Sequence, residues 1–79
     1  MSKRDIREIT CIVITELRKR KKLSQEELSG LAGLSRSHLA QIETLERLPT
    51  LATIDKICNA LDVSISQFFR IVEQERKEK

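Results

Sequence analysis

A short polar stretch in the middle of the chain carries the side chains with the clearest chemistry. Between Arg36 and Gln41, one helical face would present Arg36, Ser37, Ala40 and Gln41. Arginine can make two hydrogen bonds to guanine, glutamine can make two to adenine, and serine reaches several base edges in the major groove. This set of side chains therefore predicts readout of DNA bases.

The sequence lacks the residue patterns that catalytic sites and metal-binding sites require. The chain has one histidine and two cysteines, and Cys11 and Cys58 lie too far apart to form a CxxC pair. There is also no glycine-rich phosphate loop and no nucleophile with a base at a recognisable spacing. We expect no enzyme activity, no metal and no cofactor, and we interpret both cysteines as reduced core residues.

The polar stretch requires two short helices to position it. Ser24 and Glu27 form a capping box that opens a helix to about Ala32, and Gly33 offers a left-handed turn. Ser35 can then cap a helix from Arg36 to about Thr44. The apolar spacing lets these helices cross and share a small core, which predicts a helix-turn-helix at about residues 24–44.

The rest of the chain also indicates helices. A first helix is expected at about residues 5–21, although its β-branched stretch 9–15 would on its own predict a buried strand; no later segment offers a second strand. Thr50 can cap a fourth helix, and a second capping box at residues 64–67 opens a fifth. The charged tail 75–79 is expected to fray. We predict one all-α, five-helix domain over residues 1–79.

Size and charge set further limits. The 79 residues include 39% hydrophobic residues but only two aromatic ones, so the core is small and a second copy would add buried surface. The net charge of +3 permits binding to a polyanion without proving it. No signal peptide or membrane-spanning run is present, which predicts a cytoplasmic protein without membrane contact.

The combined pattern resembles the phage-repressor and Cro-like (Xre-type) helix-turn-helix proteins, and within them the short stand-alone restriction-modification controller proteins. The similarity covers about residues 13–69. It rests on Leu17-Arg18, residues 23–28 (LSQEEL), residues 33–37 (GLSRS), Leu39, Ile42-Glu43, Pro49-Thr50 and residues 57–64.

The resemblance implies roles for individual residues. Arg36, Ser37 and Gln41 would read bases, and Gln25 and Ser35 would contact phosphates, with Gln25 also bracing the recognition helix. His38 would reach bases or backbone, or would be a solvated surface histidine, and both interpretations stay open. Arg18 and Glu43 would form a buried structural ion pair.

Two further phosphate contacts depend on the loops. Lys22 ends the basic run 18–22, which could touch phosphates or simply be solvated. Arg47 lies in a loop where this chain has Leu45 in place of the glycine usual in the family. Leu45 therefore either adopts a left-handed conformation or the loop runs differently.

The last helix carries more apolar residues than one core stripe needs. We expect Ile65, Phe69, Ile71 and Val72 to form a homodimer interface, as in short relatives. A dimer would present two recognition helices roughly 34 Å apart and would read an inverted repeat in double-stranded DNA.

The predicted function is a sequence-specific transcriptional regulator, and the sign of regulation stays open. Glu26 matches a position through which a phage repressor contacts RNA polymerase, but the helix dipole explains an acidic residue there equally well. Two alternatives are an antitoxin-type autorepressor and a protein-interaction module. The polar face at Arg36 and Ser37 argues against the module.

Overall fold

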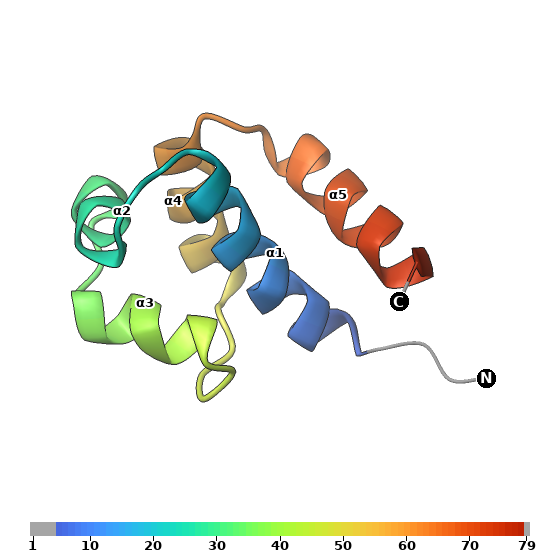
Figure 1. Cartoon of the computed structure of the whole chain (residues 1–79), viewed down its shortest axis with the longest axis horizontal. Helices are drawn as coiled ribbons and strands as arrows, with labels where there is room; N and C mark the ends of the chain where they lie inside the picture. Colours follow the sequence, from blue (N-terminus) through green and yellow to red (C-terminus); the bar gives the residue numbers. More distant parts are fainter. Residues whose placement is uncertain (1–4, 79) are drawn as a thin grey trace.

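Five helices make up most of residues 5–78, the part of the chain described by the computed structural model (Figure 1). They are α1 (Ile6–Arg20), α2 (Gln25–Ala32), α3 (Arg36–Glu43), α4 (Leu51–Leu61) and α5 (Ile65–Glu78). Residues 5–78 contain no strand. The expected all-α fold of five helices is confirmed.

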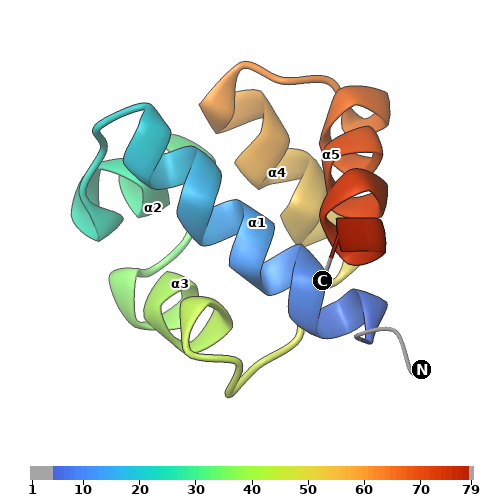
Figure 2. The same ribbon diagram turned by 45° about the vertical axis from the view of Figure 1, so that its right-hand side comes forward.

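Helix α1 runs through the middle of the molecule, with α5 on one side and α2 and α3 on the other (Figures 1 and 2). It packs against α3, α4 and α5. The strand alternative for its β-branched stretch is wrong, because Ile9, Val13 and Leu17 recur at helical spacing and are all buried. The hydroxyl of Thr10 donates to the carbonyl of Ile6 at 2.7 Å, so it stays satisfied inside the helix.

The expected helix starts are confirmed by their hydrogen bonds. In the first capping box, the Ser24 amide donates to Glu27 Oε1 at 2.8 Å and the Glu27 amide donates to Ser24 Oγ at 2.9 Å. Ser64 and Gln67 exchange the same two bonds at 3.0 Å. Thr50 Oγ1 accepts from the Thr53 amide at 3.1 Å. Each cap satisfies backbone donors that the helix itself leaves unpaired.

The core consists of aliphatic residues, two cysteines and one phenylalanine. Its fully buried residues include Phe68 of α5 and both cysteines, which are free thiols. Burial raises the pKa of Cys11, and burial together with the nearby Asp55 carboxylate raises the pKa of Cys58 to about 11. Both thiols therefore stay protonated and unreactive at neutral pH, as expected for core residues.

The C-terminal tail is helical as far as Glu78, the last described residue of α5, and Lys79 lies outside the described residues. The expected fraying of residues 75–79 stays a prediction. The Gln74 carboxamide donates to Glu78 Oε2 at 2.8 Å across the last turn, and Arg76 and Lys77 lie where the helix dipole favours cations.

The described residues contain neither a membrane-spanning helix nor a cluster of metal-ligating side chains. Within residues 5–78, no helix is long and apolar enough to cross a bilayer. The same residues contain no group of three or more His, Cys, Asp or Glu side chains that could hold a metal ion.

Candidate nucleic-acid interface

A tight turn at Gly33 joins α2 to α3. Gly33 has φ +71°, and its amide donates to the Gly30 carbonyl at 3.3 Å. The Leu34 amide donates to the Ser29 carbonyl at 2.8 Å. A Cβ added at Gly33 would meet no atom within 4 Å, so the glycine is needed for its left-handed backbone and not for space. The turn redirects the chain at once into α3.

Helix α3 has a buried face and an outward polar face. Ser35 Oγ accepts from the His38 amide at 3.0 Å and so caps the helix. Leu39 and Ile42 are fully buried against the core. On the opposite side, Arg36, Ser37 and Ser35 itself are exposed, while His38 and Gln41 are partly exposed. The predicted base-reading side chains are therefore all accessible, with Arg36, Ser37 and His38 in the first turn of α3 and Gln41 in the second.

A buried ion pair fixes the far end of α3. Arg18 donates from Nε to Glu43 Oε2 at 2.7 Å and from Nη2 to Glu43 Oε1 at 2.9 Å. Its Nη1 donates to the Leu23 carbonyl at 2.7 Å. The Arg18 and Glu43 side chains are only 12% and 5% exposed, and the carboxylate raises the pKa of Arg18. This fork geometry ties the end of α1 to the end of α3.

Gln25 joins the same group, which we call the Glu43 network (Arg18, Leu23, Gln25 and Glu43). Its Nε2 donates to Glu43 Oε1 at 3.0 Å, so the first residue of α2 is bonded to the last residue of α3. A carboxamide has a second N–H and an oxygen, which are still available to a ligand. The bracing contact is present; phosphate contact by Gln25 stays a prediction.

The loop after α3 adopts the strained form of the two alternatives. Leu45 has φ +68°, in the left-handed region that favours glycine. The amides of Glu46 and Arg47 both donate to the Gln41 carbonyl, at 2.9 and 3.2 Å, and Thr44 Oγ1 donates to Glu46 Oε2 at 2.7 Å. Arg47 is exposed on this anchored loop. Its phosphate contact stays a prediction.

Two other left-handed residues were not anticipated. Lys22 has φ +59° in the turn between α1 and α2, and Asp62 has φ +60° at the end of α4. Aspartate tolerates this conformation better than most residues, which was an available signal for Asp62. No comparable signal exists for Lys22, which is exposed.

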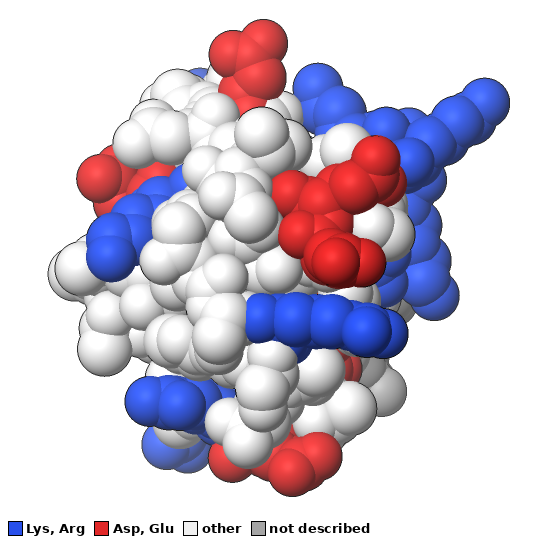
Figure 3. Space-filling view, turned by 90° about the vertical axis from the view of Figure 1, so that its left-hand side faces the viewer, with Lys and Arg blue, Asp and Glu red and all other residues white. Residues whose placement is uncertain are grey.

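The charge on the side of the molecule that carries α2 is mixed. Figure 3 looks onto this side and shows Lys and Arg side chains in several separate places, with Asp and Glu side chains among them and a largely uncharged surface. A modest net charge of +3 agrees with this picture. Binding here would depend on individual contacts more than on one strong positive field.

The predicted dimer interface is only partly exposed. Val72 is fully buried in the core of its own chain, so it has no surface to offer a second copy, and its assignment to the interface is corrected. Val72 lies on the same inward face of α5 as Phe68, four residues before it. The Phe68 ring packs edge-to-face on Phe69, with ring centroids 5.1 Å apart. Ile65 is 41% exposed, while Phe69 and Ile71 are partly buried.

Known proteins share this sequence pattern. A helix-turn-helix family profile matches residues 14–68. The chain is 42% identical over 53 residues to the immunity repressor protein of Bacillus phage phi105, a match that covers 67% of this chain but only 37% of that protein. It is 36% identical over 61 residues to control protein C.SmaI of Serratia marcescens, covering 77% of this chain and 73% of that one.

Solved structures agree over nearly the whole chain. The restriction-modification controller protein C.Esp1396I matches with a TM-score of 0.91 and 26% identity, over 96% of this chain and 99% of that chain. That protein has also been solved on a 25 base pair operator site and as a tetramer on its natural 35 base pair operator. From its sequence and its fold, the present chain belongs to the helix-turn-helix family, in the phage-repressor and Cro-like (Xre-type) branch.

Proposed function

We propose that this chain is a sequence-specific DNA-binding transcriptional regulator that binds an inverted-repeat operator as a homodimer. One observation carries the proposal: Arg36 and Ser37 are exposed side by side at the start of α3, the helix that α2 and the Gly33 turn hold outward. Such a helix fits the major groove with its first turn against the base edges.

The accessible face of α3 would divide the work between bases and backbone. Arg36 would make two hydrogen bonds to a guanine, Gln41 would bond an adenine, and Ser37 would reach a neighbouring edge. Ser35 and Gln25 would hold phosphates, because Ser35 keeps its hydroxyl proton and Gln25 keeps one N–H beyond the bonds they already make. Lys22 and Arg47, both exposed, would add phosphate contacts from the flanking loops.

The relatives support a narrower role. C.SmaI is a control protein, and C.Esp1396I is a restriction-modification controller protein that has been solved on an operator site. We therefore propose that this chain is a controller protein of the same kind and that it acts in the cytoplasm. Two copies related by a two-fold axis would read half-sites roughly one helical turn apart.

A contact with RNA polymerase would use Glu26. Glu27 is engaged in the capping box, whereas Glu26 is exposed on the first turn of α2. Under this proposal, Glu26→Gln leaves operator affinity nearly unchanged and removes activated transcription in a purified system. A variant that activates as well as the unmodified protein would remove Glu26 from the contact.

The decisive experiment is selection of binding sites from a randomised duplex pool at about 0.15 M salt, with Arg36→Ala beside the unmodified chain. We expect an inverted repeat with half-sites about one turn apart. Loss of the two bonds from Arg36 should cost about 1–3 kcal/mol and relax one base position in each half-site.

Arg70→Ala is the matched control, because it removes the same charge from an exposed position on α5. It should select the same sequence as the unmodified chain. If no sequence is enriched above weak, strongly salt-dependent binding, the regulator proposal fails and the protein-interaction module takes its place. If Arg36→Ala and Arg70→Ala weaken binding equally without relaxing any position, Arg36 does not read a base.

A further inference from the structure

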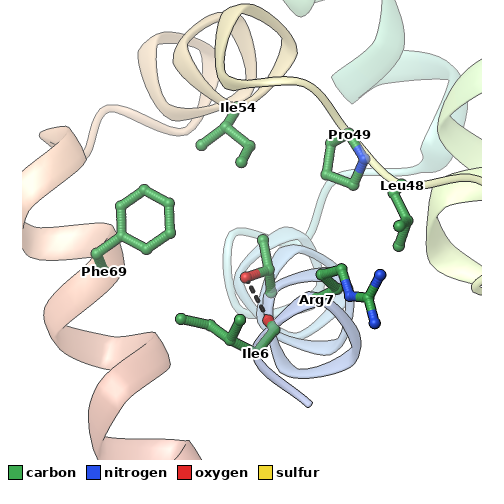
Figure 4. A pocket seen from close by; sticks show the side chains of 7 residues that line it. Ile6, Arg7, Leu48, Pro49, Ile54 and Phe69 are labelled. Atoms are coloured by element: carbon green, nitrogen blue, oxygen red, sulfur yellow. Dashed lines mark hydrogen bonds between the residues drawn. The ribbon is translucent and has the colours of Figure 1, made fainter.

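A pocket lies away from the polar face of α3, where four parts of the chain meet. The first turns of α1, the segment before α4, α4 itself and α5 contribute Ile6, Thr10, Leu48, Pro49, Ile54 and Phe69. The cavity measures about 150 Å³ and opens to the surface. Figure 4 shows these side chains arranged around an open centre. We call it the α1/α5 pocket.

The α1/α5 pocket presents hydrocarbon and almost no polar group. The Thr10 hydroxyl is used inside its own helix, where it donates to the Ile6 carbonyl at 2.7 Å. The guanidinium of Arg7 points away from the open centre in Figure 4 and is bound to Asp5, with Nε to Oδ1 at 2.9 Å and Nη2 to Oδ2 at 2.6 Å. A cavity of this size and polarity accepts one benzene-sized apolar group.

An exposed apolar side chain lies one helical turn before a residue that lines the pocket. Ile65 precedes Phe69 by four residues on α5, so both occupy the same face of the helix, and Ile65 is 41% exposed. At the rim, Ile6 is 43% and Leu48 is 49% exposed. The surface therefore combines a protruding aliphatic group with a hollow of matching chemistry. Those are the two halves of a self-complementary interface with two-fold symmetry.

We propose that the α1/α5 pocket receives Ile65 of a second copy of this chain, and that the second copy reciprocally receives Ile65 of the first. The proposal rests on the homodimer of the proposed function and goes further, because it adds α1 and the segment before α4 to an interface otherwise assigned to α5. Association of copies also agrees with the fold, since C.Esp1396I forms a tetramer on its operator.

The pocket would also connect dimer formation to DNA contact. Leu48 and Pro49, which line it, directly follow Arg47. On the other side, the Arg47 amide is bonded to the Gln41 carbonyl of α3. With the pocket filled, Arg47 would be held on both sides. Its amide is bonded to Gln41 before it, and Leu48 and Pro49 after it would be packed against the second copy. The dimer would keep this cation in a defined position, whereas the single chain would hold it from one side.

Sedimentation velocity over a concentration series tests the interface. Ile65→Ala should weaken association about tenfold per pocket, hence about a hundredfold per dimer because the two pockets are equivalent. Leu31→Ala is the matched control, since Leu31 is an exposed leucine of α2 that does not line the pocket. It should leave the dimer constant unchanged. Circular dichroism melting of all three proteins establishes that each is folded.

Cross-linking gives a direct measurement of proximity. Leu48→Cys and Ile65→Cys chains are mixed and treated with a short thiol-specific cross-linker, with the unmodified chain as control because Cys11 and Cys58 are buried. We expect a cross-linked product that joins Leu48→Cys to Ile65→Cys, and none from the unmodified chain.

The outcomes separate the two proposals. A chain that remains monomeric at every concentration and on its selected duplex overturns both the homodimer and the pocket assignment. A dimer that Ile65→Ala leaves intact, with no mixed cross-link, overturns the pocket assignment while the homodimer of the proposed function stands.

Discussion

One apolar core runs through both halves of this domain, but the halves differ in what is added to it. In the α2–α3 half, the Glu43 network adds hydrogen bonds of 2.7–3.0 Å that join α1, α2 and α3, and this half shows a polar face to solvent. The α4–α5 half is fastened by aliphatic and aromatic packing around Phe68, and it shows Ile65 and an apolar pocket.

This difference matches what each half is proposed to do. Hydrogen bonds have narrow limits of distance and angle, so the network sets the direction of α3 as well as its distance from the core. Apolar packing tolerates small changes of shape, and its leftover surface suits another apolar surface. Base reading needs the first property, and association of copies uses the second.

Phe68→Ala should have the largest effect on stability. Phe68 is the largest fully buried side chain, and its removal should cost about 4 kcal/mol of unfolding free energy in urea at fixed protein concentration. If packing alone matters in this half, Phe68→Leu should cost only about 1–1.5 kcal/mol. Equal losses in the two variants would contradict the comparison, because they would show that the site requires a particular geometry.

Glu43→Ala should come next, at about 3 kcal/mol in the same measurement, because it leaves the Arg18 charge buried without its partner. In contrast to Phe68→Leu, the shape-conserving Glu43→Gln should cost nearly as much as Glu43→Ala. The double variant Arg18→Met with Glu43→Leu should recover most of the loss. If Glu43→Gln left the unfolding free energy unchanged, packing and not charge would stabilise the α2–α3 half as well.

Ser35→Ala should cost about 1 kcal/mol of stability, because it removes the cap of α3. Ser35→Asp keeps a capping oxygen and should restore stability, while its negative charge should repel phosphate. Thermal melting and operator binding measured on both variants therefore separate the two roles. If Ser35→Asp binds the operator as tightly as the unmodified chain, Ser35 does not contact phosphate.

Leu45→Gly should have the smallest effect and the opposite sign. Glycine removes a left-handed backbone strain of about 1 kcal/mol from the folded state. Its greater conformational freedom stabilises the unfolded chain, which cancels about half of that gain. We expect a net gain of about 0.5 kcal/mol in urea unfolding. Leu45→Ala retains the strain and serves as control; a gain of the same size there would remove backbone strain as the cause.

Local patterns predicted the elements of the fold well. The capping boxes at Ser24 and Ser64, the cap at Ser35 and the glycine turn at Gly33 all involve residues within five positions of one another. Their chemistry is complete once the local sequence is known. The β-branched stretch of α1 was the exception, since its local preference for a strand was overcome by burial of its helical apolar face.

The candidate site divides in the same way. The order of polar and apolar residues along α3 was sufficient to place Arg36 and Ser37 outward and Leu39 and Ile42 inward. By contrast, the division of α5 was only partly predicted, because Val72 lies in the core and Ile65 on the surface. Periodicity identifies an apolar face but does not say which part of it neighbouring helices cover.

The sequence by itself determined where the five helices begin, which turn links α2 to α3, and which side chains of α3 lie toward solvent, because interactions along a few residues settle these features. Only the tertiary structure decided that Gln25 would bond Glu43 across 18 residues, that Leu45 would take the left-handed form, and that four separate segments would leave an apolar pocket beside Ile65. These depend on the distances and angles at which distant helices pack, and no local pattern specifies them.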